Sequence, residues 1–203
     1  MSSLGKIIIG SGNQHKIEEI KAFFSDLEFN FEGLDPELDL PEVIEDGKSY
    51  KENALKKARQ RARELNQIVL ADDSGLSVDY LDGAPGIYSA RFGGEDLNDE
   101  EKYLKLLKLL SGRPEAERKA AFISVIALVD PFENLEITVE GRCEGIIAEE
   151  PAGENGFGYD PIFYLPEYKL TMAQISQSEK NKISHRGRAL KKMKRRLKES
   201  YSQ

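Results

Sequence analysis

Cysteine, histidine and long apolar runs are all scarce in this chain of 203 residues. The one cysteine, Cys143, excludes an internal disulfide framework, and with only two histidines the chain has no set of soft ligands for a structural zinc ion. We therefore expect any bound metal to be held by oxygen. No apolar stretch approaches the roughly 18 residues of a membrane helix, and the apolar run near the start is too short for a secretion signal. The sequence predicts a cytoplasmic protein that does not bind membranes.

Charge is abundant and unevenly distributed. The chain has 29 basic and 36 acidic residues, which gives a net charge of -7. Residues 186–198 hold eight basic residues and no acidic one, so the rest of the chain is more acidic than the total suggests. Because neutralisation of phosphates supplies most non-specific affinity for nucleic acid, we expect no stable nucleic-acid partner. The basic run is interpreted either as a solvated helix face or as a binding surface, and a local basic pocket could still bind a small anion.

The order of apolar patterns predicts an α/β fold with a mixed central sheet and flanking helices. Buried strands are expected at 6–10, 29–33 and 68–71, and a hairpin at 120–129 and 135–147. Helices are expected around 17–27, from 49 to about 65, after Asn98, near 172–176 and from about 184 onward. No repeat or linker divides the sequence, so we expect residues 1–203 to form a single domain.

A strand, a polar turn and a helix follow one another near the start of the chain. The turn and the first helical residues are Ser11, Gly12, Asn13, Gln14, His15 and Lys16. Backbone amides at a helix start, together with a hydroxyl, an amide and a lysine, are typical of a cradle for phosphate oxygens. The alternative is an ordinary helix start capped by Asn13, with Lys16 exposed.

Acidic residues gather at two places that a metal could use. Glu45 lies in the acidic, proline-containing segment 34–47, and Asp72 and Asp73 follow the strand expected at 68–71. Mg²⁺ is usually bound by one or two carboxylates together with waters and phosphate oxygens. Neighbouring side chains of a strand face opposite sides, so Asp72 and Asp73 cannot both contact one ligand if the strand continues. Asp73 is therefore the better candidate for chemistry, and Asp72 could instead cap a turn or a helix.

Residues 153–161 combine three glycines with two aromatic side chains. Glycine permits close approach of the backbone to a flat ligand, and Phe157 or Tyr159 could offer a stacking face. Asp160 could bind the edge of a base or cap the turn. A surface loop anchored by buried rings has the same composition, so both interpretations stay open.

The segment 178–186 places cations at the expected start of the last helix. Ser184 resembles an N-cap, which puts His185 and Arg186 in the first helical turn. Cations are electrostatically disfavoured there by the helix dipole. An anion or an electron-rich partner is therefore expected near these two side chains, although His185 could also serve only to cap the helix.

Six blocks in a fixed order make the chain resemble the inosine triphosphate pyrophosphatases of the RdgB type. The blocks are Ser11 to Lys16, Glu45-Asp46-Gly47 before Glu52-Asn53-Ala54, Ala71 to Leu76, Gly83 to Phe92, Gly156 to Pro161, and Lys180 with Ile183 to Gly187. Each block alone is a weak signal, but their order over nearly the whole chain is specific. The resemblance implies a mixed α/β fold with two lobes around an active-site cleft, usually as a homodimer.

The resemblance also implies roles for individual residues. Glu45 and Asp73 would hold Mg²⁺, and Asp73 would also be the base that activates water. The triphosphate would be bound by Ser11, Gly12, Asn13, Gln14, His15, Lys16 and Lys180. The nucleotide pocket would be lined by Ser74, Phe157, Gly158, Tyr159, Asp160, His185 and Arg186.

The reaction implied by the resemblance is hydrolysis of ITP, dITP or XTP to the nucleoside monophosphate and pyrophosphate, with Mg²⁺ as cofactor. A 6-oxo purine accepts a hydrogen bond where adenine donates one, so a donor such as Arg186 would favour the 6-oxo bases. Two other classes of function remain open from the residues alone. One is a transferase that binds a nucleotide or a sugar phosphate at residues 11–16, and the other is a binding module that uses the basic C-terminal helix.

Overall fold

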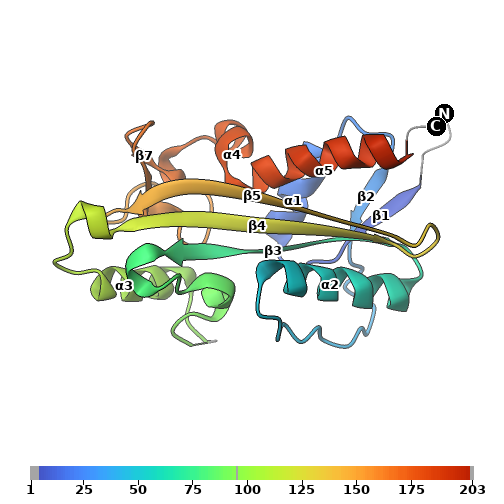
Figure 1. Cartoon of the computed structure of the whole chain (residues 1–203), viewed down its shortest axis with the longest axis horizontal. Helices are drawn as coiled ribbons and strands as arrows, with labels where there is room; N and C mark the ends of the chain where they lie inside the picture. The colour runs from blue at the N-terminus through green and yellow to red at the C-terminus, as the bar shows by residue number, and fades with distance from the viewer. Residues whose placement is uncertain (1–4, 95, 202–203) are drawn as a thin grey trace. The chain divides into compact units, whose positions relative to one another are not determined.

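The computed structural model describes residues 5–94 and 96–201 of the chain (Figure 1). Its strands are β1 (Lys6–Ile9), β2 (Asn30–Gly33), β3 (Ile68–Val78), β4 (Lys119–Asp130), β5 (Leu135–Ile147), β6 (Phe163–Leu165) and β7 (Leu170–Thr171). Its α-helices are α1 (Gln14–Phe23), α2 (Tyr50–Leu65), α3 (Asp99–Leu109), α4 (Gln177–Ile183) and α5 (His185–Tyr201). Short 3-10 helices form at Asp79–Leu81, Gly86–Arg91, Glu115–Glu117, Asp160–Ile162 and Met172–Gln174. Within the described ranges no helix is both long and apolar enough to cross a membrane.

The strands form one mixed sheet in the order β2-β1-β3-β4-β5-β6-β7. β1 pairs in parallel with β2 and with β3, whereas β6 pairs antiparallel with β5 and with β7. The parallel pairs arise because α1 and α2 provide the long crossover connections that parallel neighbours require. β4 and β5 are joined by a short turn, as the sequence predicted for a hairpin. The prediction of an α/β fold with a mixed sheet is confirmed.

The chain divides into two compact units. The first contains the described residues up to Asp73, Ser124–Gly141 and the described residues from Gly187 onward. The second contains Ser74–Ile123 and Arg142–Arg186. β3, β4 and β5 each contribute residues to both units, and the first two residues of α5 belong to the second unit.

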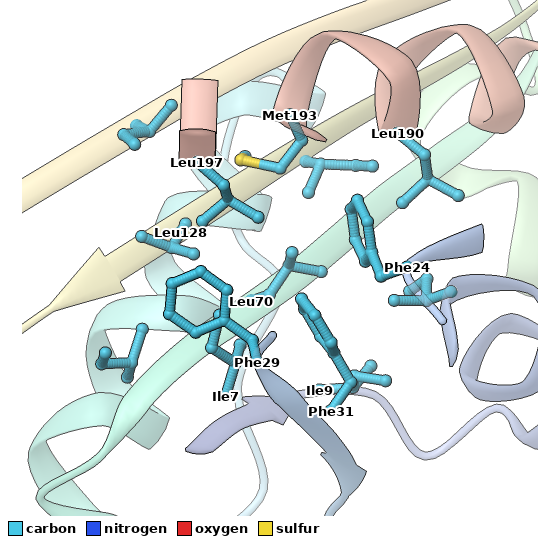
Figure 2. Close-up of a cluster of buried hydrophobic side chains, with 14 of the residues drawn as sticks. Ile7, Ile9, Phe24, Phe29, Phe31, Leu70, Leu128, Leu190, Met193 and Leu197 are labelled. Carbon is cyan, nitrogen blue, oxygen red and sulfur yellow. The ribbon is translucent and has the colours of Figure 1, made fainter. Parts of the chain in front are cut away.

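In the first unit the sheet is apolar on both faces and is covered by helices on both. Ile7 and Ile9 of β1 and Leu70 of β3 pack with residues of α1 and α5 in one buried cluster (Figure 2). Ile8 of β1, the neighbour of both isoleucines, packs with α2 on the opposite face because side chains alternate along a strand. The cluster in Figure 2 also contains Phe24, Phe29, Phe31, Leu128, Leu190, Met193 and Leu197.

In the second unit a separate apolar cluster joins the far ends of the long strands to α3 and to the segment after β6. It includes Leu76, Leu106, Phe122, Phe163 and Met172, all of them buried. The buried Arg118 guanidinium donates hydrogen bonds to the carbonyl groups of Leu110, Ile147 and Ala148. This arginine satisfies backbone groups that would otherwise be buried without partners, so its role is structural.

Local capping signals define several helix starts as predicted. The Ser49 hydroxyl accepts a hydrogen bond from the Glu52 N–H at 3.2 Å and begins α2, and Asn98 with Glu101 forms a complete capping box at α3. α2 ends at Leu65, as expected. The short helix expected near 172–176 is a 3-10 helix. The pattern of the sequence did not predict α4, although the Ser176 side chain caps it by accepting a hydrogen bond from the Glu179 N–H.

Candidate functional site

β3 continues through the acidic residues that the sequence analysis placed after its end. The strand runs from Ile68 to Val78, so the predicted end at Ala71 is wrong. Asp, Ser and Gly usually indicate a turn, but here Asp72 and Asp73 have charged partners, which offset the cost of burying them. Because side chains alternate, Asp72 shares the α1 face with Leu70, and Asp73 shares the α2 face with Ala71.

Asp72 forms a buried ion pair with Lys16 of α1. Its Oδ2 atom lies 2.7 Å from Lys16 Nζ, and its Oδ1 atom accepts a hydrogen bond from the Ser124 hydroxyl at 2.5 Å. The Asp72 side chain is fully buried and that of Lys16 is 15% exposed. The alternative in which Lys16 is exposed is therefore wrong. Through these contacts Asp72 joins α1 and β4 to β3.

The turn before α1 presents its backbone to solvent. The Asn13 side chain accepts a hydrogen bond from the Lys16 N–H at 3.2 Å and so caps the helix, which confirms that part of the alternative interpretation. Ser11 Oγ accepts a hydrogen bond from the Asn13 N–H. A Cβ atom added to Gly12 would meet nothing within 4 Å, and Gln14 and His15 are exposed. This open helix start can accept an anionic group, as the phosphate interpretation requires.

Asp73 and Glu45 lie against the same lysine of α2. Lys57 Nζ is 3.0 Å from Asp73 Oδ1 and 3.2 Å from Glu45 Oε2. The Asp73 side chain is 7% exposed, and that of Glu45 is 34% exposed. Asp73 Oδ2 is buried and has no hydrogen-bond partner among the described residues. The structure thus brings together the two carboxylates that the sequence analysis selected, with a cation between them and one carboxylate oxygen still to be satisfied.

The charges of this group change its titration. Burial raises the pKa of Asp73, the nearby Lys57 opposes that rise, and the negative charge of Glu45 adds to it. Burial alone would lower the pKa of Lys57, but the charges of Asp73 and Glu45 outweigh it and the pKa is raised. Such a carboxyl, perturbed by burial and by a specific charge partner, is typical of functional sites.

The donor set fits a magnesium ion. Among the described residues no group of three or more His, Cys, Asp or Glu side chains could hold a metal. Mg²⁺ needs fewer protein ligands, because it keeps waters and takes substrate phosphate oxygens. The two oxygen donors of Glu45 and Asp73 match its chemistry, and the position of Lys57 Nζ shows that this spot already accommodates a positive charge.

In the second unit, Asp160 organises the glycine-rich loop. Its Oδ2 atom accepts hydrogen bonds from Lys180 Nζ at 2.7 Å and from the Phe157 N–H at 2.9 Å. The Asp160 and Lys180 side chains are each 3% exposed. Gly156 has φ +81°, and a Cβ atom there would lie 2.1 Å from Asp160 Oδ2, so only glycine fits. Asp160 caps the loop, as one of the two interpretations predicted.

The Phe157 ring is the electron-rich partner expected for the cations near the start of α5. Arg186 Cζ lies 5.5 Å and Lys180 Nζ 4.8 Å from the ring centroid. Arg186 Nη2 also donates a hydrogen bond to Ser74 Oγ at 3.1 Å. His185 is buried and stacks on Phe122, with ring centroids 4.7 Å apart. Ser74, Phe157, Lys180 and Arg186 therefore form one connected group within the second unit.

The two aromatic side chains of the loop have different environments. Tyr159 is buried in the apolar cluster of the second unit, and its hydroxyl donates a hydrogen bond to the Ser89 carbonyl at 2.9 Å. Phe157 is half-buried. Of the two rings considered as stacking faces, Phe157 is therefore the one that a ligand could reach.

Two residues that hold the aspartates were not predicted from the sequence: Lys57 contacts Asp73, and Ser124 contacts Asp72. A signal for Lys57 was present, because it precedes the inward-facing Ala58 and follows Ala54 by three residues, which places it on the buried side of α2. No local pattern singles out Ser124, since it becomes a partner of Asp72 only when β4 lies beside β3.

The chain is similar to known proteins over nearly its whole length. A dITP/XTP pyrophosphatase of Clostridium perfringens is 49% identical over 201 residues, which cover 95% of this chain and 97% of the relative. A dITP/XTP pyrophosphatase of Bacillus cereus is 44% identical over 200 residues, which cover 98% of this chain and 98% of the relative. The solved structure of the Staphylococcus aureus Ham1 protein is 42% identical, with a TM-score of 0.86, and the match covers 96% of this chain and 99% of that protein.

A solved HAM1 protein from Coxiella burnetii gives the same result. It is 40% identical, with a TM-score of 0.87, and the match covers 96% of this chain and 98% of that protein. The profile described as the Ham1 family matches residues 7–196. These residues include every side chain of the two groups described above. The resemblance found in the sequence is confirmed, and the chain belongs to the Ham1 family.

Proposed function

We propose that the chain hydrolyses dITP, XTP and ITP to the nucleoside monophosphate and pyrophosphate. Relatives named dITP/XTP pyrophosphatases, 44–49% identical over nearly the whole chain, support this substrate class. The observation that carries the proposal is the arrangement at Asp73, with one carboxylate oxygen on Lys57 and the other buried without a hydrogen-bond partner among the described residues. An unsatisfied buried oxygen is costly in the free protein and is explained by a ligand that uses it.

Glu45 and Asp73 would hold the magnesium ion of this reaction. When bound, Mg²⁺ acts as a Lewis acid that neutralises charge on phosphate oxygens. Lys57 lies against both carboxylates, so the same place also offers a protein cation to the substrate. The two acidic side chains and the lysine together match a negatively charged polyphosphate that arrives with a divalent cation.

Asp73 would act as the general base. Water attacks the α-phosphorus, the proton passes to a carboxylate oxygen of Asp73, and the bond to the pyrophosphate leaving group breaks. A base must be ionised to accept the proton, and the positive charge of Lys57 opposes the effect of burial on the pKa of Asp73. Reactions of this kind depend mainly on positioning and on electrostatic stabilisation.

The triphosphate would bind to residues 11–16 and to Lys180. The open backbone around Gly12 and the start of α1 provide N–H groups, and the ion pair with Asp72 holds Lys16 in place. Lys180 pairs with Asp160, but an ammonium group can donate three hydrogen bonds, so this contact is compatible with a phosphate oxygen.

The base would be recognised by the group around Phe157. The Phe157 ring offers a stacking face, and the side chains of His185 and Arg186 can donate hydrogen bonds to a 6-oxo group. Adenine presents an amine at the same place, which would oppose those donors. Four further residues complete this group. Ser74 accepts a hydrogen bond from Arg186, and Asp160 accepts one from Lys180. Gly158 and Tyr159 anchor the loop through their hydrogen bonds to Asp99 and to the Ser89 carbonyl.

One assay tests this function against its alternatives. The chain is incubated with Mg²⁺ and XTP, dITP, ITP or ATP, and pyrophosphate, orthophosphate and nucleoside monophosphate are measured. We expect equal amounts of pyrophosphate and monophosphate from the 6-oxo nucleotides and far less from ATP. Release of orthophosphate in place of pyrophosphate would refute the proposal. Products that form only when an acceptor is added would indicate a transferase. No product under either condition would indicate a binding module.

The homodimer implied by the resemblance and the cytoplasmic location expected from the sequence stay predictions. Light scattering of the purified chain would test the first, with a dimer of twice 22.8 kDa expected. Fractionation of cells that produce the protein would test the second.

A further inference from the structure

We propose that Asp99 of α3 is a positioning residue for base recognition, because it holds the Gly158 peptide and thereby fixes the place of the Phe157 ring. This inference rests on the proposed function and adds to it a residue that lies outside all six blocks of the family resemblance. Asp99 contacts Gly158 and Lys102, both of them within the second unit. Its influence on the reaction would act entirely through the loop of residues 156–160.

The contact between α3 and the loop is short and charge-assisted. The Gly158 N–H donates a hydrogen bond to Asp99 Oδ2 at 2.7 Å. Asp99 is the first residue of α3, and the capping box of Asn98 and Glu101 defines where that helix begins. The other carboxylate oxygen of Asp99 lies 3.9 Å from Lys102 Nζ, one helical turn further on. Asp99 therefore projects from a well-defined helix start rather than from a loose segment.

The loop needs such a contact because glycines flank the ring on both sides. Gly156 has φ +81° and Gly158 has φ +63°, in the left-handed region that favours glycine. Glycine restricts its neighbours least, so the backbone alone does not set the direction of the Phe157 side chain. Hydrogen bonds on either side of the ring must do so. On one side the Phe157 N–H binds Asp160, and on the other the Gly158 N–H binds Asp99.

These two contacts differ in how firmly they are built. Asp160 is buried and also paired with Lys180, so the inner contact is fixed by the core of the second unit. The Asp99 side chain is 54% exposed, and it supplies the outer contact. Removing it would leave the Gly158 peptide with the longer hydrogen bond that the Phe157 carbonyl accepts from the Asp160 N–H at 3.3 Å, so its orientation would be less firmly fixed while the fold remains intact. The ring of Phe157 would then lose its fixed position beside Lys180 and Arg186.

Hydrogen exchange tests the positioning directly and does not require an active enzyme. Exchange of the amides of residues 156–160 is compared in the wild-type chain, Asp99→Ala and Asp99→Asn, with Glu100→Ala as control. Glu100→Ala removes a charge from the same first turn of α3 but leaves the Gly158 contact in place. We expect exchange about tenfold faster in Asp99→Ala and near wild type in Asp99→Asn, whose amide oxygen still accepts the bond. Unchanged exchange in Asp99→Ala, or equal changes in Asp99→Ala and Glu100→Ala, would overturn the inference.

Kinetics then test the consequence for the substrate. With XTP and Mg²⁺ we expect Asp99→Ala to raise KM about three- to tenfold with kcat within twofold, because the groups that act on the phosphates are untouched. Asp99→Asn should restore KM. A lower kcat with an unchanged KM would overturn the inference. If the wild-type chain releases no pyrophosphate, the proposed function fails instead, and the exchange measurement still decides whether Asp99 positions the loop.

Discussion

At the scale of single residues, Asp72 and Asp73 have opposite surroundings because β3 continues through both of them. Asp72 has both of its oxygens engaged, by Ser124 and Lys16, and its side chain is fully buried. Asp73 has one oxygen on Lys57 and a second that has no hydrogen-bond partner in the described parts of the chain. A satisfied buried carboxylate contributes to structure, whereas an unsatisfied one is available for chemistry. Substitution of each by asparagine should therefore give opposite phenotypes.

Asp73→Asn should abolish turnover and keep nucleotide binding. The amide cannot accept the proton from water, and loss of a general base costs about 10²- to 10⁴-fold in rate. The side chain keeps its size, so the fold and the second unit's group around Phe157 are unaffected. Pyrophosphate release from XTP measures the first effect and calorimetric titration with nucleotide the second. Turnover within tenfold of wild type would remove Asp73 from the role of base.

Asp72→Asn should mainly destabilise the chain. The amide oxygen can still accept from Ser124, but the Lys16 ammonium would lose its buried counter-charge. Breaking a buried pair in this way costs about 3 kcal/mol in the free energy of unfolding. Urea denaturation at neutral pH measures this loss in the free energy of unfolding. Asp46→Asn is the control, because it breaks an ion pair with Lys56 that is exposed. Equal stability of the two variants would show that the Asp72 pair contributes nothing.

The raised pKa of Asp73 predicts a pH dependence of stability in the metal-free chain. The folded state keeps the Asp73 proton above the ordinary value of 3.8, so it binds more protons than the unfolded state in that window. The contribution of Asp73 is fully present below 3.8 and is lost as pH rises through the raised value. The asparagine of the Asp73→Asn variant does not titrate, so the variant's stability does not decrease in this way as the pH rises. Its free energy of unfolding, relative to wild type, should therefore increase as the pH is raised from 3.8 toward neutrality. A constant difference in urea denaturation across that range would contradict the prediction.

At the scale of elements, Tyr201 joins the end of α5 to the turn between β4 and β5. Its hydroxyl donates a hydrogen bond to Asp130 Oδ2 at 2.5 Å, and Asp130 Oδ1 accepts from the N–H groups of Phe132 and Glu133 in the turn. The Tyr201 ring also contacts Phe29 edge-on, with centroids 5.2 Å apart. One aspartate thus connects two elements whose sequences are far apart.

Tyr201→Phe should lower stability and flatten its alkaline decline. Burial and the bond to Asp130 raise the pKa of Tyr201 above its ordinary value of 10.0. Its contribution is therefore fully present below pH 10 and is lost as pH rises through the higher folded value. Without the hydroxyl, the free energy of unfolding at pH 8 should fall by about 1 kcal/mol, and its decrease toward pH 11 should be shallower. Guanidinium denaturation measures both, with the exposed Tyr168→Phe as control. Parallel pH curves for wild type and Tyr201→Phe would contradict this prediction.

Elements defined by local signals were predicted from the sequence, and those defined by distant partners were not. The start of α3 follows from Asn98 and Glu101, three residues apart, and the structure shows that capping box. The end of β3 was misplaced because Asp72 and Asp73 look like turn residues until Lys16, Ser124 and Lys57 are brought to them. Sequence order alone does not reveal such pairings. For the candidate site, the sequence is enough to select the acidic residues. It does not reveal which face of the sheet Asp72 and Asp73 each occupy.

At the scale of the whole molecule, charge balance predicts how the chain behaves toward nucleic acid. The net charge is -7, and three of the basic residues of α5 lie close to carboxylates within the first unit. Lys194 pairs with Asp26, Arg195 and Arg196 lie close to Glu199, and Lys192 donates to the Glu140 carbonyl. Cations that already lie close to carboxylates neutralise fewer DNA phosphates, and the acidic excess of the chain opposes binding, so we expect little affinity for DNA.

The chain should accordingly show no binding to duplex DNA at physiological salt. Fluorescence anisotropy of a labelled duplex measures it, with salt varied from about 50 to 200 mM, the range over which phosphate contacts lose most of their affinity. Lys191→Glu with Arg195→Glu serves as the matched variant, because it reverses charge on the exposed face of α5. We expect flat anisotropy for both proteins. Binding by the wild-type chain that is lost in the variant would contradict this prediction. It would identify the exposed face of α5 as a surface that binds nucleic acid.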